Sequence, residues 1–599
     1  MHEALKYPFD AGYIMKKRRS IRKELTADEG RKFLEKKIAI LGGSTTHDIK
    51  ETLELFLLDA GIRPTFYESE FAQYWQDAMF SQELRDFAPD LCFIHTSFRN
   101  LTSLPVLTDT EAQIAEKADA EFARFRAMWE TLRRDLGCPI IQNNFEPPFY
   151  RVLGNRDAWD VHGKGRYTAE MNRRFADYAA GHEGFYLHDI AYLAADFGLS
   201  AWSDPFFWHM YKYCLSMEAI PAFAHSLSAI ICSIWGGRRK VLTLDLDNTL
   251  WGGIVGDDGP EHLLIGHETS MGQVYSEFQS YCKELASSGI LLTVDSKNDE
   301  ANALAGLNHP EGTLRPDDFA KIAANWDPKD KNLIETADAL HLLTGSFVFA
   351  DDNPAERAIV SGGVPDAAIA QMDEPEHYVY AIDRAMYFEP ADLSGADLER
   401  GEMYRANAAR ERQMAQFENY EDYLKSLEMH AEIAPFAPVY YPRIAQLTNK
   451  SNQFNLTTLR CSEPQIEAAA ADPDTVTLYG KLTDKYGDNG LISVVMGHVS
   501  KDALDLTLWL MSCRVLKRQM EDAMLDAVVK EAKRRGLVRL IGHYYATAKN
   551  HMVENFYRDF GFTKTAQNGE DTDWELDISL YENKNRVIDV QEADTTARG

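Results

Sequence analysis

Acidic, hydroxyl and amine side chains follow a series of short apolar segments in the middle of the sequence. In chain order they are Asp245, Asp247, Ser296, Lys297, Lys329, Asp351 and Asp352. Carboxylates in such a set can bind Mg²⁺, which prefers oxygen ligands and is commonly held by one or two carboxylates together with a substrate phosphate. A further carboxylate can attack phosphorus as a nucleophile, while its neighbour donates and accepts a proton. The residue types therefore favour phosphoryl transfer.

Three apolar segments must bring these residues together. The segments VLTLDLD, ILLTVDSK and SFVFADD alternate with helical patterns at residues 274–288 and near residues 331–343. Such alternation predicts a parallel sheet, and the carboxyl ends of its strands form a ligand crevice. Taken one by one, the aspartate motifs are explained as well by turns and helix caps. Their order on successive strand ends favours one common site.

Length and composition limit the possible classes of protein. At 599 residues the chain exceeds one domain, since domains average about 150 residues. No segment approaches the roughly 20 apolar residues that cross a bilayer, and no apolar run follows the basic residues 15–23. The net charge of -30 disfavours nucleic acid and anionic membranes as partners. We expect a cytoplasmic protein with small-molecule or protein partners.

The cysteines do not predict a structural framework. There are seven, they are dispersed, and no two of them form a C-x-x-C pair. A disulfide scaffold or a structural zinc site is therefore not expected.

Patterns outside the aspartate region predict further domains. Strand, glycine-rich turn and helix follow one another from residue 37, and strand patterns recur at residues 91–95 and 139–145, which indicates a first α/β unit. Strands and helices of a third, α+β unit follow a polar helical connector, and the polar C-terminal tail is expected to be frayed. The predicted divisions are 1–236, 237–393, 394–428, 429–581 and 582–599.

The motifs DLDNTLWGG, SKND, NWDPK and DDNPAER resemble the haloacid dehalogenase (HAD) superfamily, and within it the FkbH-like group. The resemblance implies a HAD-like Rossmannoid domain at 237–393 and a magnesium-dependent enzyme. It implies Asp245 as nucleophile, Asp247 as acid–base, and Ser296, Lys297 and Lys329 as phosphate-binding residues. The implied magnesium ligands are Asp245, Asp247, Asp351 and Asp352.

The group's chemistry implies an acyl transfer after the phosphoryl step. A glyceryl unit from 1,3-bisphosphoglycerate is passed to the phosphopantetheine arm of an acyl carrier protein, so that a small phosphorylated metabolite and a carrier protein are the expected partners. Many members have a cysteine where this chain has Asp295. A carboxylate cannot form a stable thioester, so another thiol is needed, and Cys513 before a predicted helix is the candidate catalytic cysteine.

Two other functions fit the same sequence. One is a phosphatase that acts on a small metabolite without acyl transfer, which Asp295 favours. The other is a non-catalytic scaffold that binds carrier or partner proteins through its outer domains. The complete set of aspartates argues against this second function.

The flanking domains resemble two further folds. GGST at residues 42–45 resembles the nucleophile loop of SGNH hydrolases, with Ser44 as nucleophile, His209 as base at an unusual spacing from Asp204, and Asn143 or Asn144 as oxyanion donor. A binding domain without catalysis, or Ser44 as a simple helix cap, are the alternatives. NHMVENFYRDFGF at residues 550–562 resembles the closing motif of acetyltransferase (GNAT) domains.

Overall fold

The structure is a computed structural model of the chain. It describes residues 2–28, 30–393, 419–451, 453–512, 515–547 and 549–592, together with residues 398, 403, 404, 406, 410, 413, 414 and 417. The chain forms two compact units, Met1–Ser233 (unit 1) and Ile234–Gly599 (unit 2). Most of the predicted connector, 394–428, lies outside the described residues. None of the described helices is both long enough and apolar enough to span a membrane.

Unit 1 contains a parallel sheet of five strands in the order β2-β1-β3-β4-β5. Two of these strands were not expected from the sequence: β2 because its residues are mostly polar or partly exposed, and β5 because it is only four residues long. The strands are β1 (Leu34–Gly42), β2 (Ile62–Glu68), β3 (Leu91–His95), β4 (Ile140–Asn143) and β5 (Phe185–His188).

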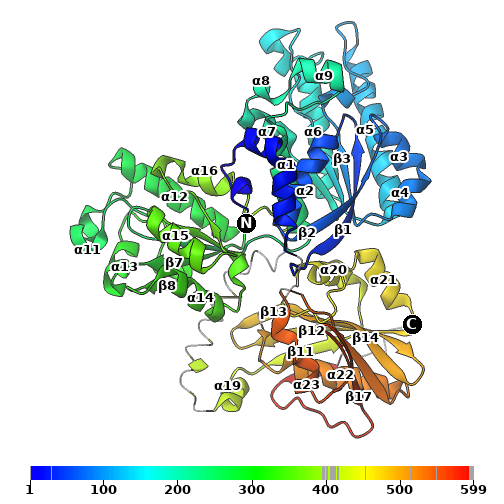
Figure 1. Ribbon diagram of the computed structural model, residues 1–599, viewed down its shortest axis with the longest axis vertical. Coiled ribbons are helices and arrows are strands. Elements are labelled where there is room, and N and C mark those ends of the chain that lie inside the picture. The colour runs from blue at the N-terminus through cyan, green and yellow to red at the C-terminus, as the bar shows by residue number, and fades with distance from the viewer. Residues whose placement is uncertain are drawn as a thin grey trace. The chain divides into compact units, whose positions relative to one another are not determined.

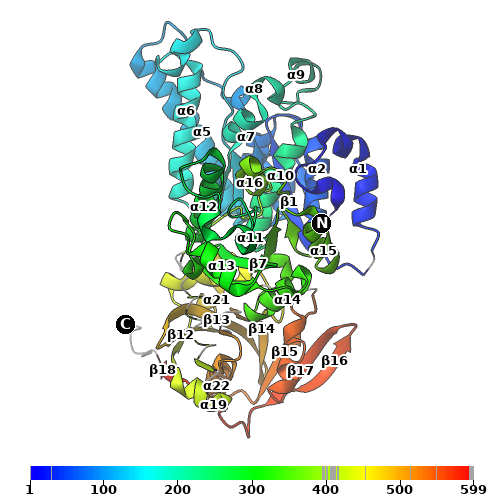
Figure 2. The same cartoon turned by 90° about the vertical axis from the view of Figure 1, so that its left-hand side faces the viewer.

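Helices flank this sheet in Figure 1. On one face, α3, α5 and α6 pack against Ala39 and Leu41 of β1 through a core centred on the fully buried Trp129. The long helices α5 and α6 run side by side in Figure 2. The helices of unit 1 are α1 (Ala11–Leu25), α2 (His47–Asp59), α3 (Tyr74–Phe80), α4 (Gln82–Phe87), α5 (Glu111–Leu136), α6 (Lys164–Ala180), α7 (Ile190–Phe197), α8 (Leu199–Trp202), α9 (Pro205–Tyr211) and α10 (Ile220–Ile234).

The first sheet of unit 2 is also parallel, with the order β10-β9-β6-β7-β8. Apolar clusters cover both of its faces, as a parallel sheet requires. The strands are β6 (Val241–Leu244), β7 (Leu291–Ser296), β8 (Phe319–Ala324), β9 (Phe347–Ala350) and β10 (Ala368–Ile369). The helices are α11 (Val255–Asp258), α12 (Ser270–Ser287), α13 (Glu300–Leu307), α14 (Lys329–Ala339), α15 (Pro354–Gly363) and α16 (Tyr378–Asp383).

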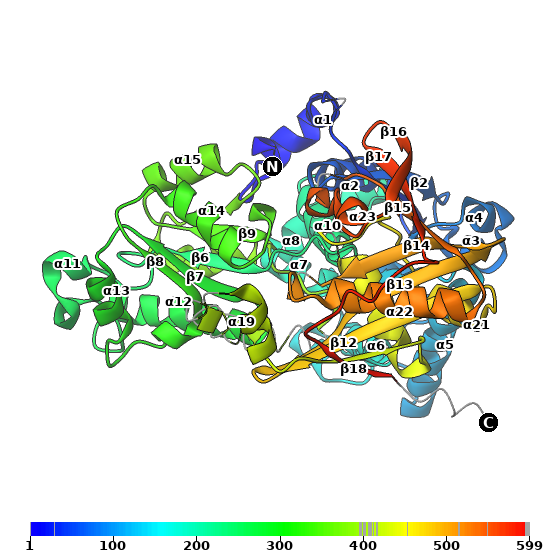
Figure 3. The same ribbon diagram turned by 90° about the horizontal axis from the view of Figure 1, so that it is seen from below.

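The second sheet of unit 2 has eight strands in the order β16-β17-β15-β14-β13-β12-β11-β18. Its pairs are antiparallel except β14–β15 and β11–β18. Figure 3 shows α22 (Met520–Arg534) lying along this sheet, and Met524 and Val528 of the helix belong to its core. The strands are β11 (His430–Ala434), β12 (Thr475–Asp484), β13 (Gly487–Ser500), β14 (Ala503–Met511), β15 (Arg539–Tyr544), β16 (Thr563–Asn568), β17 (Asp571–Asp577) and β18 (Asp589–Glu592).

Short helices complete this part of unit 2. They are α19 (Tyr420–Ser426), α20 (Tyr441–Lys450), α21 (Glu463–Ala471), α22 (Met520–Arg534) and α23 (Phe556–Asp559). The expectation of a frayed tail from residue 582 is wrong for β18. This strand pairs with β11 as the last strand of the sheet, and Ile588 just before it is buried. The expected multidomain α/β architecture is confirmed.

Candidate active site

The carboxyl ends of β6, β7 and β9 carry the predicted aspartates of unit 2 together with Ser296 and Lys297, whereas Lys329 begins α14 after β8. Asp245 follows β6, which lies between β7 and β9, and Asp351 follows β9. The backbone N–H of Asp245 donates to the carbonyl of Ala350 at 2.9 Å, so the β6–β9 pairing continues up to the first aspartate. Asn248 then has a φ of 57°, and this left-handed residue turns the chain sharply after the second aspartate.

Three of the aspartates form one group of oxygen ligands. Carboxylate oxygens of Asp245, Asp351 and Asp352 all lie within 4.8 Å of one another. Asp351 is fully buried, and Asp245 is 7% exposed. Hard oxygen donors converging at this spacing fit Mg²⁺, since a divalent cation relieves the repulsion between carboxylates that are held apart from water.

The carboxylate of Asp247 lies in a different environment. It accepts hydrogen bonds from Trp251 Nε1 at 2.9 Å, from the backbone N–H of Val255 at 3.0 Å and from Asn298 Nδ2 at 2.9 Å. Burial raises the pKa of Asp247 above its ordinary value. The sequence-based expectation listed Asp247 among the metal ligands, and its carboxylate faces these three donors. Hydrogen bonds from Val255 and Trp251 favour the charged form and partly oppose the effect of burial on the pKa of Asp247.

Lys329 is the cation of the site and begins α14. Its Nζ lies 2.8 Å from Asp245 Oδ1 and 2.6 Å from Asp351 Oδ2, and the side chain is 3% exposed. Burial alone would lower the pKa of Lys329, but the two aspartates together raise it. Burial, and then repulsion from Asp245, raises the pKa of Asp351 to about 6 and also raises that of Asp352. Asp245, Asp351 and Asp352 thus place three carboxylates around the ammonium group of Lys329.

Asp295 is a buried member of the same site. Asn332 Nδ2 donates to its Oδ1 at 3.0 Å, whereas its Oδ2 has no hydrogen-bond partner among the described residues. Burial raises the pKa of Asp295 to about 7, and Lys329 lowers it less than burial raises it. Asn332 is three residues after Lys329 on α14, so the two side chains lie on the same face of this helix.

The two remaining predicted phosphate-binding residues differ in their surroundings. Ser296 ends β7 and is 2% exposed, next to the group of aspartates at the same sheet edge. Lys297 instead forms an ion pair with Glu356 at 2.6 Å, and 35% of its side chain is exposed. The positive charge of Lys297 is therefore partly neutralised by Glu356, a residue of α15.

Four further residues support the site and were not expected from the sequence. Asn298 and Trp251 hold Asp247, Asn332 holds Asp295, and Arg357 donates to the backbone carbonyls of Asp351 and Met372 at 2.8 and 2.9 Å. Asn298, Trp251 and Arg357 lie within the motifs already quoted, SKND, DLDNTLWGG and DDNPAER, so the signal was present. The atoms that these residues contact are determined by the tertiary structure.

The predicted groups of unit 1 are arranged differently from the expectation. Ser44 Oγ donates to Cys214 Sγ at 3.3 Å, and among the hydrogen bonds of the described residues none joins Ser44 to His209. Ser44 is not the cap of α2 either, because Thr46 is the N-cap residue. Asn144 donates to Asp189 at 2.6 Å and is thereby engaged in local structure. Cys513, the candidate catalytic cysteine, lies outside the described residues.

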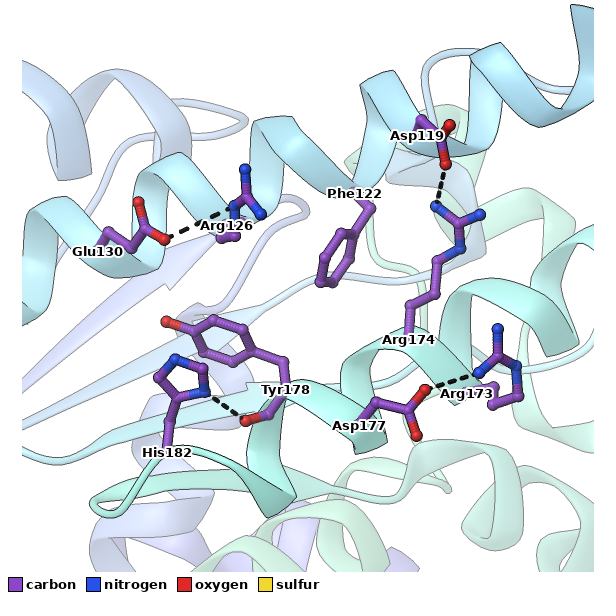
Figure 4. A pocket seen from close by; sticks show the side chains of 9 residues that line it. All are labelled: Asp119, Phe122, Arg126, Glu130, Arg173, Arg174, Asp177, Tyr178 and His182. Atoms are coloured by element: carbon purple, nitrogen blue, oxygen red, sulfur yellow. Dashed lines mark hydrogen bonds and ion pairs between the residues drawn. The ribbon is translucent and has the colours of Figure 1, made fainter.

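A pocket of about 540 Å³ lies between α5 and α6 in unit 1 (Figure 4). Arg173 and Arg174 in this pocket form ion pairs with Asp177 and Asp119 at 2.7 Å, and His182 stacks on Tyr178. Acidic and basic side chains alternate along its walls, so their charges are mutually neutralised. None of the predicted site residues lines it.

The chain was compared with known families and solved structures. Residues 37–232 match the family model "FkbH, N-terminal domain". The N-terminal part of a Bacteroides fragilis protein, a crystal structure that contains a phosphatase domain complexed with Mg, matches with 27% identity and a TM-score of 0.58, covering 63% of this chain and 99% of that one. No curated protein matches this chain.

Acetyltransferase structures match a smaller part of the chain. The ribosomal-protein-S18-alanine N-acetyltransferase of Escherichia coli is 14% identical, with a TM-score of 0.20, and the match covers 26% of this chain and 99% of that one. PaiA N-acetyltransferase of Thermoplasma acidophilum in complex with coenzyme A is 17% identical, with a TM-score of 0.19, and the match covers 24% and 98%. Scores this low establish nothing about cofactor or activity.

Proposed function

We propose that unit 2 is a magnesium-dependent phosphatase of the HAD type, with Asp245 as its nucleophile. The observation that carries the proposal is the group of Asp245, Asp351 and Asp352 oxygens beside the buried Lys329, at the carboxyl ends of parallel strands. The likeness to a phosphatase-domain structure complexed with Mg supports it. We further propose that 237–393 and 429–581 are separate domains of unit 2, the second GNAT-like, joined by 394–428.

The residues suggest an order of events. A carboxylate oxygen of Asp245 attacks phosphorus, the bond to the leaving oxygen breaks, and an aspartyl-phosphate forms. Asp247 donates a proton to that leaving oxygen and later removes one from the water that hydrolyses the intermediate. Lys329, Ser296 and the more exposed Lys297 stabilise the phosphoryl oxygens. Bound Mg²⁺ supplies positive charge that stabilises the negative charge developing in the transition state.

We extend the proposal to acyl transfer, which rests on the FkbH resemblance. The substrate would be an acyl phosphate such as 1,3-bisphosphoglycerate, and the acceptor the phosphopantetheine thiol of an acyl carrier protein. In this reaction a thiol attacks the carbonyl carbon and the bond from that carbon to the phosphate oxygen breaks, while Asp245 attacks the phosphorus of the phosphate ester. Attack of Asp245 on the acyl phosphate itself would instead release a carboxylate that cannot acylate a thiol. The match of residues 37–232 to the FkbH N-terminal domain supports this choice of partner. Cys513 remains the proposed thiol of unit 2.

Asp295 favours a second candidate function, a phosphatase that acts without acyl transfer. It is buried at the position of the family thiol, where a carboxylate cannot hold a stable acyl group. In that case the acyl product is released to water, and the carrier protein is not a partner.

One experiment tests both functions. The enzyme is incubated with Mg²⁺, 1,3-bisphosphoglycerate and a phosphopantetheinylated carrier protein, and both phosphate release and the intact mass of the carrier are measured. Phosphate release with a glyceryl gain on the carrier supports acyl transfer, whereas release without a gain supports the phosphatase alone. Absence of release, or equal release by Asp245→Asn, contradicts the phosphoryl chemistry itself.

A further inference from the structure

Polar side chains also mark the carboxyl ends of four neighbouring strands in unit 1. Ser44 lies two residues after β1, and His95, Asn143 and His188 are the last residues of β3, β4 and β5. All four are buried, and none is more than 2% exposed. The ends of parallel strands are where α/β folds bind ligands, so this row of side chains occupies the functional edge of the sheet.

Hydrogen bonds connect the side chains of this row, and their donors and acceptors can be assigned. Asn143 Nδ2 lies 2.8 Å from His95 Nδ1 and 3.2 Å from the carbonyl of Thr96. The carbonyl can only accept, so the nitrogen of the amide faces both groups, and His95 Nδ1 is an acceptor. Asn143 Oδ1 in turn accepts from His188 Nδ1 at 3.1 Å, and His188 Nε2 lies 3.1 Å from the hydroxyl of Ser226 on α10.

The row ends on the sulfur of Cys214. With Nδ1 of His95 accepting, its Nε2 carries the proton and lies 3.2 Å from Cys214 Sγ. Ser44 Oγ is a second donor to the same sulfur at 3.3 Å. A thiol sulfur is a weak acceptor that needs no partner, so a merely structural network gains little by ending there. Two donors on one sulfur suit a nucleophile, because they stabilise the negative charge that it develops.

Burial keeps the resting cluster uncharged. It raises the pKa of Cys214 to about 12 and lowers the pKa values of His95 and His188 to about 3. Cys214 is therefore a thiol that must lose its proton during a reaction, as the nucleophile of a serine enzyme does.

Unpartnered polar atoms lie within electrostatic range of Cys214. Glu146 is fully buried, its Oε1 has no hydrogen-bond partner among the described residues, and neither does Arg99 Nε. Both residues act electrostatically on Cys214. A buried acceptor and a buried donor without partners destabilise the fold unless a ligand forms hydrogen bonds with them. An amide group can do both, because its N–H can donate to Glu146 Oε1 and its carbonyl can accept from Arg99 Nε.

We propose that unit 1 contains a second reactive centre, in which Cys214, supported by His95 and Ser44, accepts an acyl group from a thioester whose thiol arm carries an amide. The sulfur of Cys214 forms a bond to the carbonyl carbon, and the bond from that carbon to the leaving sulfur breaks. The proton of Cys214 passes to the leaving sulfur, with the Ser44 hydroxyl as the nearest relay. Transfer of an acyl group from a thioester to a thiol gives a new thioester and a free thiol, so the step needs no oxidant, reductant or further energy source.

The test uses the full-length chain and S-acetyl-N-acetylcysteamine, a small thioester with one amide. We expect intact-mass spectrometry to show the gain of one acetyl group, which peptide mapping places on Cys214 and neutral hydroxylamine removes. S-ethyl thioacetate, which lacks the amide, is expected to react at least about tenfold more slowly. Asp245→Asn is expected to react normally, because the centre does not depend on the phosphoryl chemistry of unit 2.

Variants separate a reactive centre from a structural network. Cys214→Ser is expected to lose the label, while Cys138→Ser, which removes a more exposed thiol of unit 1, keeps it. His95→Leu is expected to slow labelling about tenfold or more, and His95→Gln, which keeps an N–H donor, to restore most of the rate. Thermal melts verify that each variant is folded. A folded wild-type chain without label, a label that survives Cys214→Ser, or one that resists hydroxylamine overturns the proposal.

Discussion

Lys329 Nζ lies 2.8 Å from Asp245 Oδ1, so the helix that follows β8 supplies the cation for the carboxylate that follows β6. The same ammonium group contacts Asp351 at 2.6 Å. One lysine therefore ties together the proposed nucleophile and a proposed metal ligand. Both contacts are almost completely buried, which makes the site sensitive to the loss of either charge.

Removing the nucleophile should eliminate turnover while keeping the fold. Asp245→Asn keeps the shape of the side chain but loses its negative charge and most of its nucleophilicity. We expect phosphate release to fall by at least about a thousandfold, measured with excess Mg²⁺. Asp317→Asn, an exposed aspartate of the same sheet domain, is the matched control and should retain full activity. Turnover within tenfold of wild type would exclude Asp245 as nucleophile.

Removing the buried cation should destabilise unit 2. Lys329→Met leaves Asp245 and Asp351 without their shared partner, and breaking a buried ion pair on one side costs about 3–5 kcal/mol. Chemical denaturation in EDTA measures this loss. Lys331→Met is the control on the same helix, because its side chain is 57% exposed and its ion pairs contribute less than about 1 kcal/mol. Equal losses in the two variants would mean that the buried contacts carry no such energy.

Asn298 should control the protonation of Asp247. Its amide donates to Asp247 Oδ2 at 2.9 Å, and a donor to a carboxylate favours the charged form. In Asn298→Ala the pKa of Asp247, already raised by burial, should rise further. Because Asp247 is proposed to act first as an acid, the basic limb of the kcat/KM profile should move to higher pH.

The control for this shift is Asn308→Ala, which changes an exposed asparagine at the end of α13. Its pH profile should coincide with that of wild type. A basic limb that stays in place in Asn298→Ala, with only kcat reduced, would assign Asn298 a purely structural role.

Asp295 should make the stability of the metal-free chain depend on pH. Its folded-state pKa of about 7 lies above the ordinary value of 3.8, so between these pH values the folded chain holds a proton that the unfolded chain has lost. Stability contributed by this group is complete below about pH 4 and is lost as the pH rises to about 7. Asp295→Asn should therefore be more stable than wild type at pH 8, by up to about 4 kcal/mol, and about equal at pH 4.

Thermal melts of both chains in EDTA across pH 4–8 measure this difference. The matched control is again Asp317→Asn, which removes an exposed carboxylate and should follow the wild-type curve. A constant offset between Asp295→Asn and wild type at every pH would show that the carboxyl group of Asp295 does not titrate in this window.

Magnesium should stabilise the chain more at high pH than at low pH. Protons compete with the cation for Asp351, whose pKa is raised to about 6, and for Asp352, whose pKa is also raised. The rise in Tm on adding Mg²⁺ should be several degrees at pH 8 and small at pH 5. Asp352→Asn should reduce the rise at pH 8, and an equal rise at both pH values would place the cation elsewhere.

Part of this architecture follows from local pattern. Apolar runs that end in aspartate or serine predicted β6, β7 and β9, and the helical pattern at residues 274–288 predicted α12. Strands without such a signal were missed. The residues of β16 are all exposed, and three of the four residues of β18 are polar, so only their pairing with β17 and β11 makes them strands.

The sequence alone determined which residue types stand at successive strand ends, because that order is written along the chain. The tertiary structure decided which of them share a ligand: Asp245, Asp351 and Asp352 converge, whereas Asp247, two residues from Asp245, is held by Trp251, Val255 and Asn298. It also revealed that Cys214 lies beside His95, 119 positions away. Convergence of this kind depends on strand order and on burial, which no local spacing encodes.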